Sequence, residues 1–413
     1  MSTQNLGTLI LAAADTGGDA VAFQMRRGVR RERLTFAEAG VAARRTAAWL
    51  LAGGLSPGDR IVVWAPNMLE YAVLYFGAWL AGVVVVPIDV RTRQEVVDRF
   101  VTAAAPRLGF KSRDLDGTFG APVEQTFALE DLLGLVGDVK PIQTVPATTP
   151  DSLCEVAFTS GTTGTPKGVM LTHGNFLAEV EALRRGFPLD RGERALSVLP
   201  LSHALEQTVG LLLAFVSGVR VTYVPRINAL TMSRTLQEDR ITCMIVVPEV
   251  LRLLLNGIER QAQRQGQGAN WRRAHRLAGR LPFPLRRLLF HRVHQALGGH
   301  LCFFGCGGAA LDRAVAEAWE RMGVRIYEGY GLTETSGAAT INSPTARRLG
   351  SAGRPLPGVA VRIAADGEIQ IRGPSVTPGY YQNPDLTARS FVDGWLRTGD
   401  IGTLDADAPA GPR

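Results

Sequence analysis

The chain has 413 residues, which is longer than one hydrophobic core usually organises, so we expect two or three subdomains. Its 46% hydrophobic and 20% charged residues exclude a disordered chain and are typical of a globular protein. The formal net charge of +7 comes almost wholly from arginine, because lysine stands only at positions 111, 140 and 167.

The cysteines are too few and too scattered for a disulfide framework. They are Cys154, Cys243, Cys302 and Cys306. The nearest pair, at 302 and 306, has no second pair and no nearby histidine that would complete a zinc site. Residues 1–8 also lack the basic segment and the apolar run of a secretory signal. We therefore expect a reducing, cytoplasmic compartment.

The first part of the chain, residues 1–225, alternates helix-like and strand-like segments. Residues 36–51 carry apolar side chains at helical spacing, and the apolar run 60–64 predicts a strand. The uncharged stretch 71–88 approaches the length that spans a bilayer. It divides at Gly82 into a helix-like half and a β-branched half, so we interpret it as a buried helix followed by a buried parallel strand. The alternation predicts a doubly wound α/β sheet.

Residues 159–168 form the densest polar motif, TSGTTGTPKG. Its hydroxyls, glycines and single lysine can wrap phosphate oxygens with O–H donors, backbone N–H groups and one cation. An ordinary surface turn is the alternative, but such turns rarely concentrate so many donors. A phosphate-loop NTPase is disfavoured, because its motif places glycine directly before the lysine, where this chain has Pro166.

A second α/β block is expected from residue 226 to 345. Its strand candidates are the apolar runs 241–248, 300–305 and 324–331. Residues 346–404 change to alternating segments rich in glycine and proline, in which Asp366 and Gly367 are typical of a hairpin turn. We expect a small β-rich, barrel-like subdomain there, followed by a hinge or terminal tail over 405–413.

Within the second block, the stretch from Arg260 to His300 carries nine arginines and no acidic residue, mixed with leucines and aromatic side chains. One interpretation is a solvated basic face of helices. The other is a patch that makes peripheral contact with anionic lipid or attracts polyanionic substrates. No groove-reading motif accompanies the charge, so we expect no nucleic-acid partner.

More motifs follow the polar loop, and their order along the chain is informative. They are GGAAL at 307–311, YEGYGLTET at 327–335, GEIQIRG at 367–373, GYYQNP at 379–384 and WLRTGD at 395–400. Together with the loop they resemble the adenylate-forming superfamily, which includes acyl-CoA synthetases, luciferases and peptide-synthetase adenylation domains. The resemblance runs from about residue 34 to 404 and is closest to long-chain fatty-acyl-CoA ligases.

The resemblance implies that these segments bind ATP. Tyr330 would offer its ring to the adenine, between glycines that let the backbone approach the base. The matching residues imply that Thr333 contacts the α-phosphate, that Glu334 is the metal ligand and holds Mg²⁺, and that Asp400 accepts hydrogen bonds from the ribose. Taken alone, Tyr330 would be a core aromatic and Asp400 a turn residue.

The resemblance implies two sets of residues for the nucleotide and the reaction. The expected ATP- or AMP-binding residues are Thr159, Ser160, Gly161, Thr162, Thr163, Gly164, Lys167, Gly307, Gly308, Glu328, Gly329, Tyr330, Gly331, Thr333 and Asp400. The expected catalytic residues are Thr333, Glu334, His203 and Lys167. Gly307 and Gly308 are also typical of a tight strand-to-helix turn, and both interpretations can hold.

The stretch LPLSHALE at 199–206 looks like the long-chain branch, in which the histidine stands near the substrate carboxylate and gates the acyl channel. His203 is that candidate, although a lone histidine beside leucines is also typical of a core. Peptide-synthetase domains place an aspartate near here, where this chain has Leu205, so an amino-acid substrate is disfavoured, although the adjacent Glu206 weakens that argument. The expected acyl-binding residues are His203, Val247, Pro248, Gly305 and Tyr330, of which the pair at 247 and 248 could equally be core.

The resemblance implies ATP-dependent activation of a medium- or long-chain fatty acid to an acyl-adenylate with release of pyrophosphate, then transfer to CoA in the full-length enzyme. The cofactors would be ATP, Mg²⁺ and CoA. The alternatives are transfer to a carrier protein's phosphopantetheine, and a non-catalytic acyl- or nucleotide-binding module. Family members continue into a small lid with a lysine, and no lysine follows Lys167. We therefore expect this chain to bind ATP and acyl-adenylate, to adenylate weakly and to form no thioester.

Overall fold

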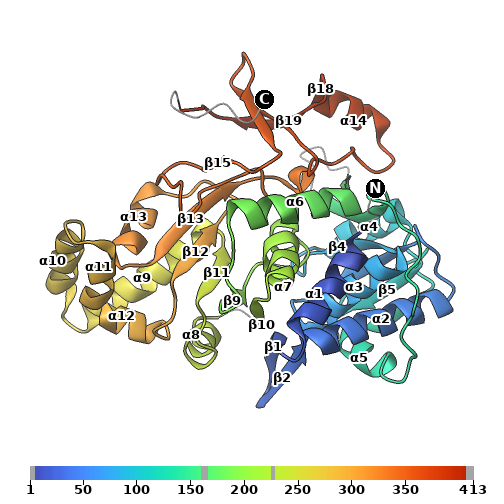
Figure 1. Cartoon of the computed structure of the whole chain (residues 1–413), viewed down its shortest axis with the longest axis horizontal. Helices are drawn as coiled ribbons and strands as arrows, with labels where there is room; N and C mark the ends of the chain where they lie inside the picture. The colour runs from blue at the N-terminus through green and yellow to red at the C-terminus, as the bar shows by residue number, and fades with distance from the viewer. Residues whose placement is uncertain (1–4, 160–165, 225–227, 406–413) are drawn as a thin grey trace.

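The computed structural model describes residues 5–159, 166–224 and 228–405. Two large β-sheets lie side by side, and a small third sheet lies across one end of both (Figure 1). The large sheets are mostly parallel and the small one is antiparallel. This arrangement confirms the predicted α/β fold class.

The first large sheet has six strands in the order β6-β5-β3-β4-β7-β8, and its neighbours are parallel except for the last pair. The strands are β3 (Arg60–Trp64), β4 (Val84–Ile88), β5 (Leu108–Lys111), β6 (Gln125–Ala128), β7 (Leu153–Thr159) and β8 (Lys167–Thr172). Strands β3 and β4 are almost wholly buried, which is why they contain runs of valine instead of an alternating pattern. Both confirm the strands predicted there.

Helices cover this sheet and pack on one another. They are α1 (Leu6–Gly17), α2 (Phe36–Ala52), α3 (Leu69–Ala81), α4 (Gln94–Ala104), η1 (Leu129–Asp131), α5 (Leu132–Leu135) and α6 (His173–Gly186). Helix α2 begins where Thr35 and Glu38 form a capping box. Every residue of α3 is buried, and α3 packs against α1 and α2, as a helix that is apolar on all sides should. The interpretation of 71–88 as core is therefore confirmed.

The second large sheet has nine strands in the order β15-β14-β13-β12-β11-β9-β10-β1-β2. The strands are β1 (Val21–Arg27), β2 (Arg30–Thr35), β9 (Arg194–Ser197), β10 (Arg220–Tyr223), β11 (Cys243–Val246), β12 (Phe303–Cys306), β13 (Arg325–Tyr330), β14 (Thr340–Ile341) and β15 (Arg354–Pro355). The strands from β13 to β1 are parallel, and the edge strands are antiparallel. Strands β11, β12 and β13 confirm the apolar runs predicted after residue 226.

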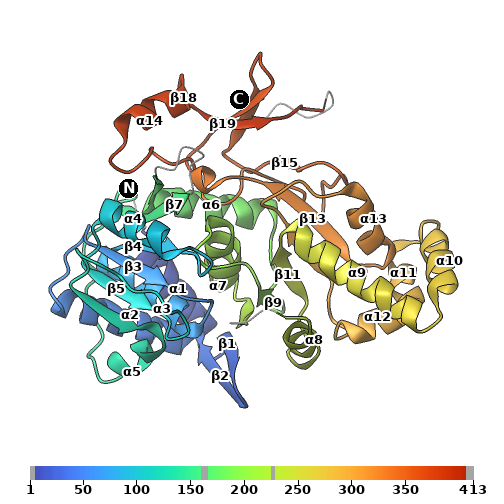
Figure 2. The ribbon, with the colours of Figure 1, turned by 180° about the vertical axis from the view of Figure 1, so that it is seen from behind.

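The helices of the second sheet are η2 (Glu206–Leu213, a π-helix), α7 (Ala214–Val216), α8 (Ala229–Glu238), α9 (Pro248–Arg264), α10 (Gly268–Ala278), α11 (Phe283–Leu289), α12 (His291–Ala296) and α13 (Arg313–Arg321). Figure 2 shows α9 to α13 gathered at the end of the molecule opposite α2 and α5. None of the helices in the described part of the chain combines the length and apolar character that a bilayer crossing requires.

The nine-stranded sheet combines strands from stretches that are far apart in the sequence. Strands β1, β2, β9 and β10 precede the boundary predicted at residue 225, yet they belong to the same sheet as β11 to β13. The boundary was predicted from the local sequence pattern. Membership of a sheet depends instead on pairing between distant segments, such as Phe23 with Val221. The predicted domain limits stay a prediction.

The small sheet is antiparallel, with the order β16-β17-β19-β18. Its elements are β16 (Ala360–Ile363), β17 (Glu368–Arg372), α14 (Pro384–Ser390), β18 (Phe391–Val392) and β19 (Trp395–Ile401). The predicted hairpin turn joins β16 to β17, and Gly367 adopts the positive φ of 85° that favours glycine. This small antiparallel sheet confirms the predicted β-rich subdomain, and in the described residues it is open, because β16 and β18 are not paired.

Candidate active site

The predicted phosphate loop joins β7 to β8 at the edge of the first sheet. Thr159 ends β7, Lys167 begins β8, and these two residues pair across the antiparallel ladder. The two ends of the loop are therefore held side by side. Outside the described residues lie Ser160, Gly161, Thr162, Thr163 and Gly164, so their contact with phosphate stays a prediction.

Strand β8 is bonded on its other side by a stretch from the C-terminal third of the chain. Met170 N donates to the Gly379 carbonyl over 3.0 Å. Tyr381 N donates to the Gly168 carbonyl over 2.7 Å. The Thr377 hydroxyl adds a bond to the Met170 carbonyl, of 2.5 Å, and accepts one from Gly379 N, of 3.0 Å. These bonds fix the GYYQNP motif against the strand that begins with the motif lysine.

The same stretch holds Glu334. Thr377 N donates to the Glu334 carbonyl over 2.7 Å, and the Tyr380 hydroxyl donates to Glu334 Oε1 over 2.8 Å. Burial and the Glu334 charge raise the pKa of Tyr380, so its hydroxyl remains a donor at neutral pH. The short helix η3 (Thr333–Thr335) also contacts β8 directly. The segment that begins at Lys167 and the segment that contains Glu334 therefore converge, as the sequence predicted.

A second pair of predicted nucleotide-binding residues meets where the small sheet approaches the nine-stranded sheet. The Tyr330 hydroxyl, at the end of β13, donates to Asp400 Oδ2, on β19, over 2.7 Å. Burial raises the pKa of Tyr330, so it too remains a donor. Tyr330 is half-buried and Asp400 is exposed. A ring that is tethered through its hydroxyl presents its face in a fixed orientation, which suits stacking on a base.

The glycines beside Tyr330 are required by close packing. A Cβ on Gly331 would come within 2.5 Å of Ala338 Cα, and a Cβ on Gly329 would come within 3.0 Å of the Thr340 carbonyl. The backbone after β13 therefore runs against the following segment with no room for a side chain.

The turn after β12 carries the other predicted glycines. Gly308 has a φ of 79° and is exposed, which agrees with the tight-turn interpretation. A Cβ on Gly307 would meet Leu205 Cδ2 at 3.4 Å, an ordinary contact, so protein packing alone does not require glycine there. Close by, Leu311 N donates to Glu328 Oε1 over 3.4 Å, and burial raises the pKa of Glu328. The Glu328 side chain therefore connects β13 with this turn.

His203 lies at the surface, with 52% of its side chain exposed, so the interpretation as a core histidine is wrong. Its Nε2 lies 2.8 Å from Asp89 Oδ2. Asp89 follows β4 and also accepts from Arg91, at 2.8 Å from the backbone N and 2.6 Å from Nη2. Burial alone would raise the pKa of Asp89, but the hydrogen bonds from His203 and Arg91 outweigh it and lower the pKa below its usual range. A fixed anion therefore holds the His203 ring.

Glu206 is wholly buried where η2 begins. The Ser197 hydroxyl donates to Glu206 Oε1 over 2.5 Å and accepts from Asn67 Nδ2 over 2.8 Å. Burial raises the pKa of Glu206 to about 8, so this carboxyl is mostly protonated at neutral pH. Because the Glu206 side chain is wholly enclosed and already bonded to Ser197, it is not presented to an incoming substrate as a surface carboxylate would be.

An apolar cavity of about 50 Å³ lies between η2 and the strands β11, β12 and β13. Its lining includes Val209, Gly210, Leu213, Ile245, Gly305 and Tyr327. Of the predicted acyl-binding residues, Gly305 lines this cavity. Val247 instead lies beside Gly308, and Pro248 is buried at the first turn of α9. The cavity is smaller than the roughly 300–1,000 Å³ of typical ligand pockets, so an acyl chain can enter it only if lining side chains move.

Glu334 has the chemistry of a magnesium ligand. Among the described residues, no three or more His, Cys, Asp or Glu side chains gather as a metal cage. Mg²⁺ in nucleotide sites needs no such cage, because phosphate oxygens and water supply most of its ligands. A half-buried carboxylate that is oriented by Tyr380 fits this pattern.

Comparison with known proteins gives the family. The profile of the family described as AMP-binding enzyme matches residues 11–381. The chain belongs to this family. The long-chain-fatty-acid–CoA ligase FadD15 of Mycobacterium bovis is 33% identical to this AMP-binding enzyme, over 91% of the chain and 68% of the relative. The sulfoacetate–CoA ligase of Cupriavidus necator is 31% identical, over 86% of the chain and 68% of the relative.

A solved structure agrees with the fold of this AMP-binding enzyme. The N-terminal domain of FACL13 from Mycobacterium tuberculosis has a TM-score of 0.81 and 22% sequence identity, and the match covers 98% of both chains. At 22% sequence identity, this structural similarity shows a shared fold. It places the whole described architecture, including the small antiparallel sheet, within one known domain arrangement.

Several residues of the site in this AMP-binding enzyme were not predicted. Asp89, Thr377 and Tyr380 received no role from the sequence, although Tyr380 lies in the GYYQNP motif. Their partners lie far away in sequence: Tyr380 bonds a residue 46 positions earlier, and Asp89 bonds one 114 positions later. The tyrosine pair in the GYYQNP motif was the available signal, and it did not predict which side chain either tyrosine would contact.

Proposed function

We propose that this chain binds ATP with Mg²⁺ and a medium- or long-chain fatty acid, and joins them as an acyl-adenylate with release of pyrophosphate. One observation carries the proposal. The 377–381 stretch bonds both β8, the strand that begins at Lys167, and Glu334, so that strand and the metal-ligand candidate lie against the same stretch of chain. The family match and the names of the fatty-acid–CoA ligase relatives support the reaction class.

In the proposed reaction the acid's carboxylate oxygen attacks the α-phosphorus, and the bond to the bridging oxygen of pyrophosphate breaks. The chain's contribution is positioning and charge. Lys167 and the loop before it would hold the outer phosphates, Thr333 would bond the α-phosphate, and Glu334 would hold Mg²⁺, whose charge offsets that of the phosphates. Tyr330 and Asp400, already joined by a hydrogen bond, would receive the adenine and the ribose.

The acid would enter beside His203. Because Asp89 accepts a hydrogen bond from the ring, His203 is held in one orientation and its other nitrogen can face the substrate carboxylate. The cavity beside Gly305 would then receive the first part of the acyl chain. Val247 and Pro248 remain proposed acyl contacts.

The acyl acceptor would be CoA, in line with the names of the relatives. A carrier-protein phosphopantetheine is the alternative. All four cysteines are free thiols, which favours a reducing, cytoplasmic compartment.

The function is tested by calorimetry with ATP, Mg²⁺ and non-hydrolysable acyl-adenylates of graded chain length, together with a pyrophosphate-exchange assay. We expect one nucleotide per chain, tighter binding of a long-chain than of an acetyl adenylate, and loss of Mg²⁺-dependent ATP binding in Glu334→Ala. Release of inorganic phosphate instead of pyrophosphate would point to an NTPase and contradict the proposal. Normal Mg²⁺-dependent binding in Glu334→Ala would remove the metal assignment.

A further inference from the structure

The arginine-rich stretch takes no part in the proposed reaction. We call residues 260–300 the basic lobe; it comprises the end of α9 and all of α10, α11 and α12. It lies at one end of the molecule's long axis, away from the first sheet (Figures 1 and 2). Its charge therefore projects from the protein and is not directed at the predicted nucleotide site.

The arginines of the basic lobe fall into two groups. Arg286 and Arg287 are half-buried and donate to backbone carbonyls, at 3.2 Å to Glu320 and at 2.7 Å to Leu301. These two have a structural role. The other seven arginines are exposed, and among the described residues none of them forms an ion pair. Their charge is available to a partner.

Helix α10 arranges part of this charge on one face. Arg272, Arg273, Arg276 and Leu277 follow the i, i+1, i+4, i+5 spacing, which at about 3.6 residues per turn places them on one side of a helix. All four are exposed, Leu277 by 50%. Trp271 lies on the opposite side, where it packs against Phe290 at a centroid distance of 5.5 Å. The helix is therefore anchored by its apolar face and presents cations together with a leucine.

Exposed leucines occur on the next helix as well. Leu285 and Leu288 of α11 are 46% and 69% exposed, at the i, i+3 spacing of one helical face. A phosphate backbone or an acidic peptide offers such leucines little contact, whereas the boundary between headgroups and acyl chains accommodates both arginine and leucine. The combination favours a lipid surface over nucleic acid.

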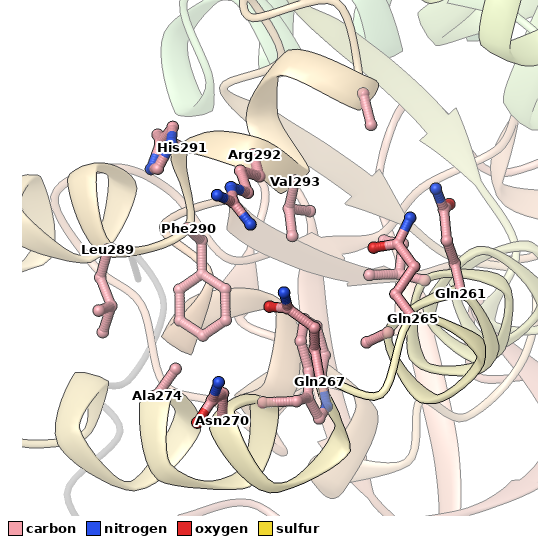
Figure 3. A pocket seen from close by; sticks show the side chains of 14 residues that line it. Gln261, Gln265, Gln267, Asn270, Ala274, Leu289, Phe290, His291, Arg292 and Val293 are labelled. Carbon is pink, nitrogen blue, oxygen red and sulfur yellow. The ribbon is translucent and has the colours of Figure 1, made fainter.

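The basic lobe also contains a groove, on the side of α10 that carries Trp271. It measures about 320 Å³ and lies between α9, α10 and α12 (Figure 3). Its lining includes the apolar side chains of Trp271, Phe290 and Val293. Because these lie on the side of α10 opposite its exposed arginines, the docking face is formed by those arginines and the exposed leucines and does not include the groove.

We propose that the basic lobe docks this protein on an anionic bilayer surface. The arginines approach the lipid phosphates, and the leucines on α10 and α11 enter the headgroup boundary. Each arginine near such a surface contributes about 1 kcal/mol at low salt, which corresponds to roughly fivefold in binding. The three α10 arginines together account for about a hundredfold.

The test is sedimentation with vesicles of phosphatidylglycerol and phosphatidylcholine, compared with phosphatidylcholine alone. We expect binding to the anionic vesicles and release at about 1 M salt, where the Debye length falls to ~3 Å. Replacing Arg272, Arg273 and Arg276 with glutamine should weaken binding about a hundredfold, whereas replacing them with lysine should weaken it much less. Equal thermal midpoints of the variants confirm that each is folded.

The matched control carries Arg30→Gln, Arg33→Gln and Arg93→Gln, three exposed arginines outside the basic lobe. If this control loses as much vesicle binding as the α10 variant, the binding follows overall charge and the proposal is wrong. Equal binding to neutral vesicles also contradicts it. So does binding to heparin or RNA without binding to anionic vesicles, which would assign the lobe to a polyanion.

Discussion

Removing the Tyr380 hydroxyl tests how Glu334 is held. Tyr380 is 8% exposed and its hydroxyl donates to Glu334 Oε1 over 2.8 Å, so Tyr380→Phe deletes one hydrogen bond to a carboxylate without changing the ring. Deleting a partner that orients a metal ligand typically lowers metal affinity about 10- to 100-fold, or ~1.4–2.7 kcal/mol. The free energy of unfolding should fall by only about 1 kcal/mol, because the ring keeps its packing.

The assay measures ATP binding by calorimetry at increasing Mg²⁺ concentrations. We expect the Mg²⁺ concentration for half-maximal binding to rise about 10- to 100-fold in Tyr380→Phe. Tyr381→Phe is the matched control, because its backbone bonds β8 but its hydroxyl is not bonded to Glu334. An unchanged Mg²⁺ requirement in Tyr380→Phe, with Glu334→Ala strongly impaired, would refute the orienting role. An equal shift in Tyr381→Phe would mean a general disturbance of this stretch.

Gly331→Ala should reduce the free energy of unfolding by about 1–3 kcal/mol in urea titrations, because the added Cβ would lie 2.5 Å from Ala338 Cα, and an unchanged midpoint would contradict that packing. Glu206→Gln should flatten the pH dependence of stability. The folded pKa of about 8 exceeds the unfolded value of 4.5, so this group's stabilising effect is complete below pH ~4.5 and is lost, on the order of 5 kcal/mol, as pH rises through about 8. A wild-type curve without that fall would exclude the raised pKa. Asp89→Asn should raise the KM for the fatty acid up to about tenfold and leave the KM for ATP unchanged, because the substitution weakens the hydrogen bond that holds the His203 ring. An equal change in both KM values would argue against a role of Asp89 in positioning His203.

The sequence predicted local structure well where one periodicity dominates. The strand at 60–64, the buried helix and strand within 71–88, and the hairpin turn at Asp366 and Gly367 all occur as expected. Each is determined by near neighbours: valine runs favour buried strands, and an Asp-Gly pair favours a tight turn. The motifs also identified which segments carry the candidate site.

Pairing between distant segments was not predictable in the same way. Strand β1 pairs with β10, nearly two hundred residues later in the sequence, and its local pattern does not predict that partner. The same holds for Asp89 with His203 and for Tyr380 with Glu334, each of which depends on how the sheets come together. The local pattern also left two environments open for a histidine beside leucines, and the fold decides between them by placing His203 at the surface.

The central claim is that the loop ending at Lys167 and the segment containing Glu334 hold one nucleotide. A crystal structure of the chain with Mg²⁺ and a non-hydrolysable acyl-adenylate, and a second with an ATP analogue, would test it most directly. We predict the adenine on the Tyr330 ring, the ribose hydroxyls at Asp400 and the ATP phosphates between Lys167 and Glu334. Density for the nucleotide at any other place, with these side chains unchanged, would contradict the account.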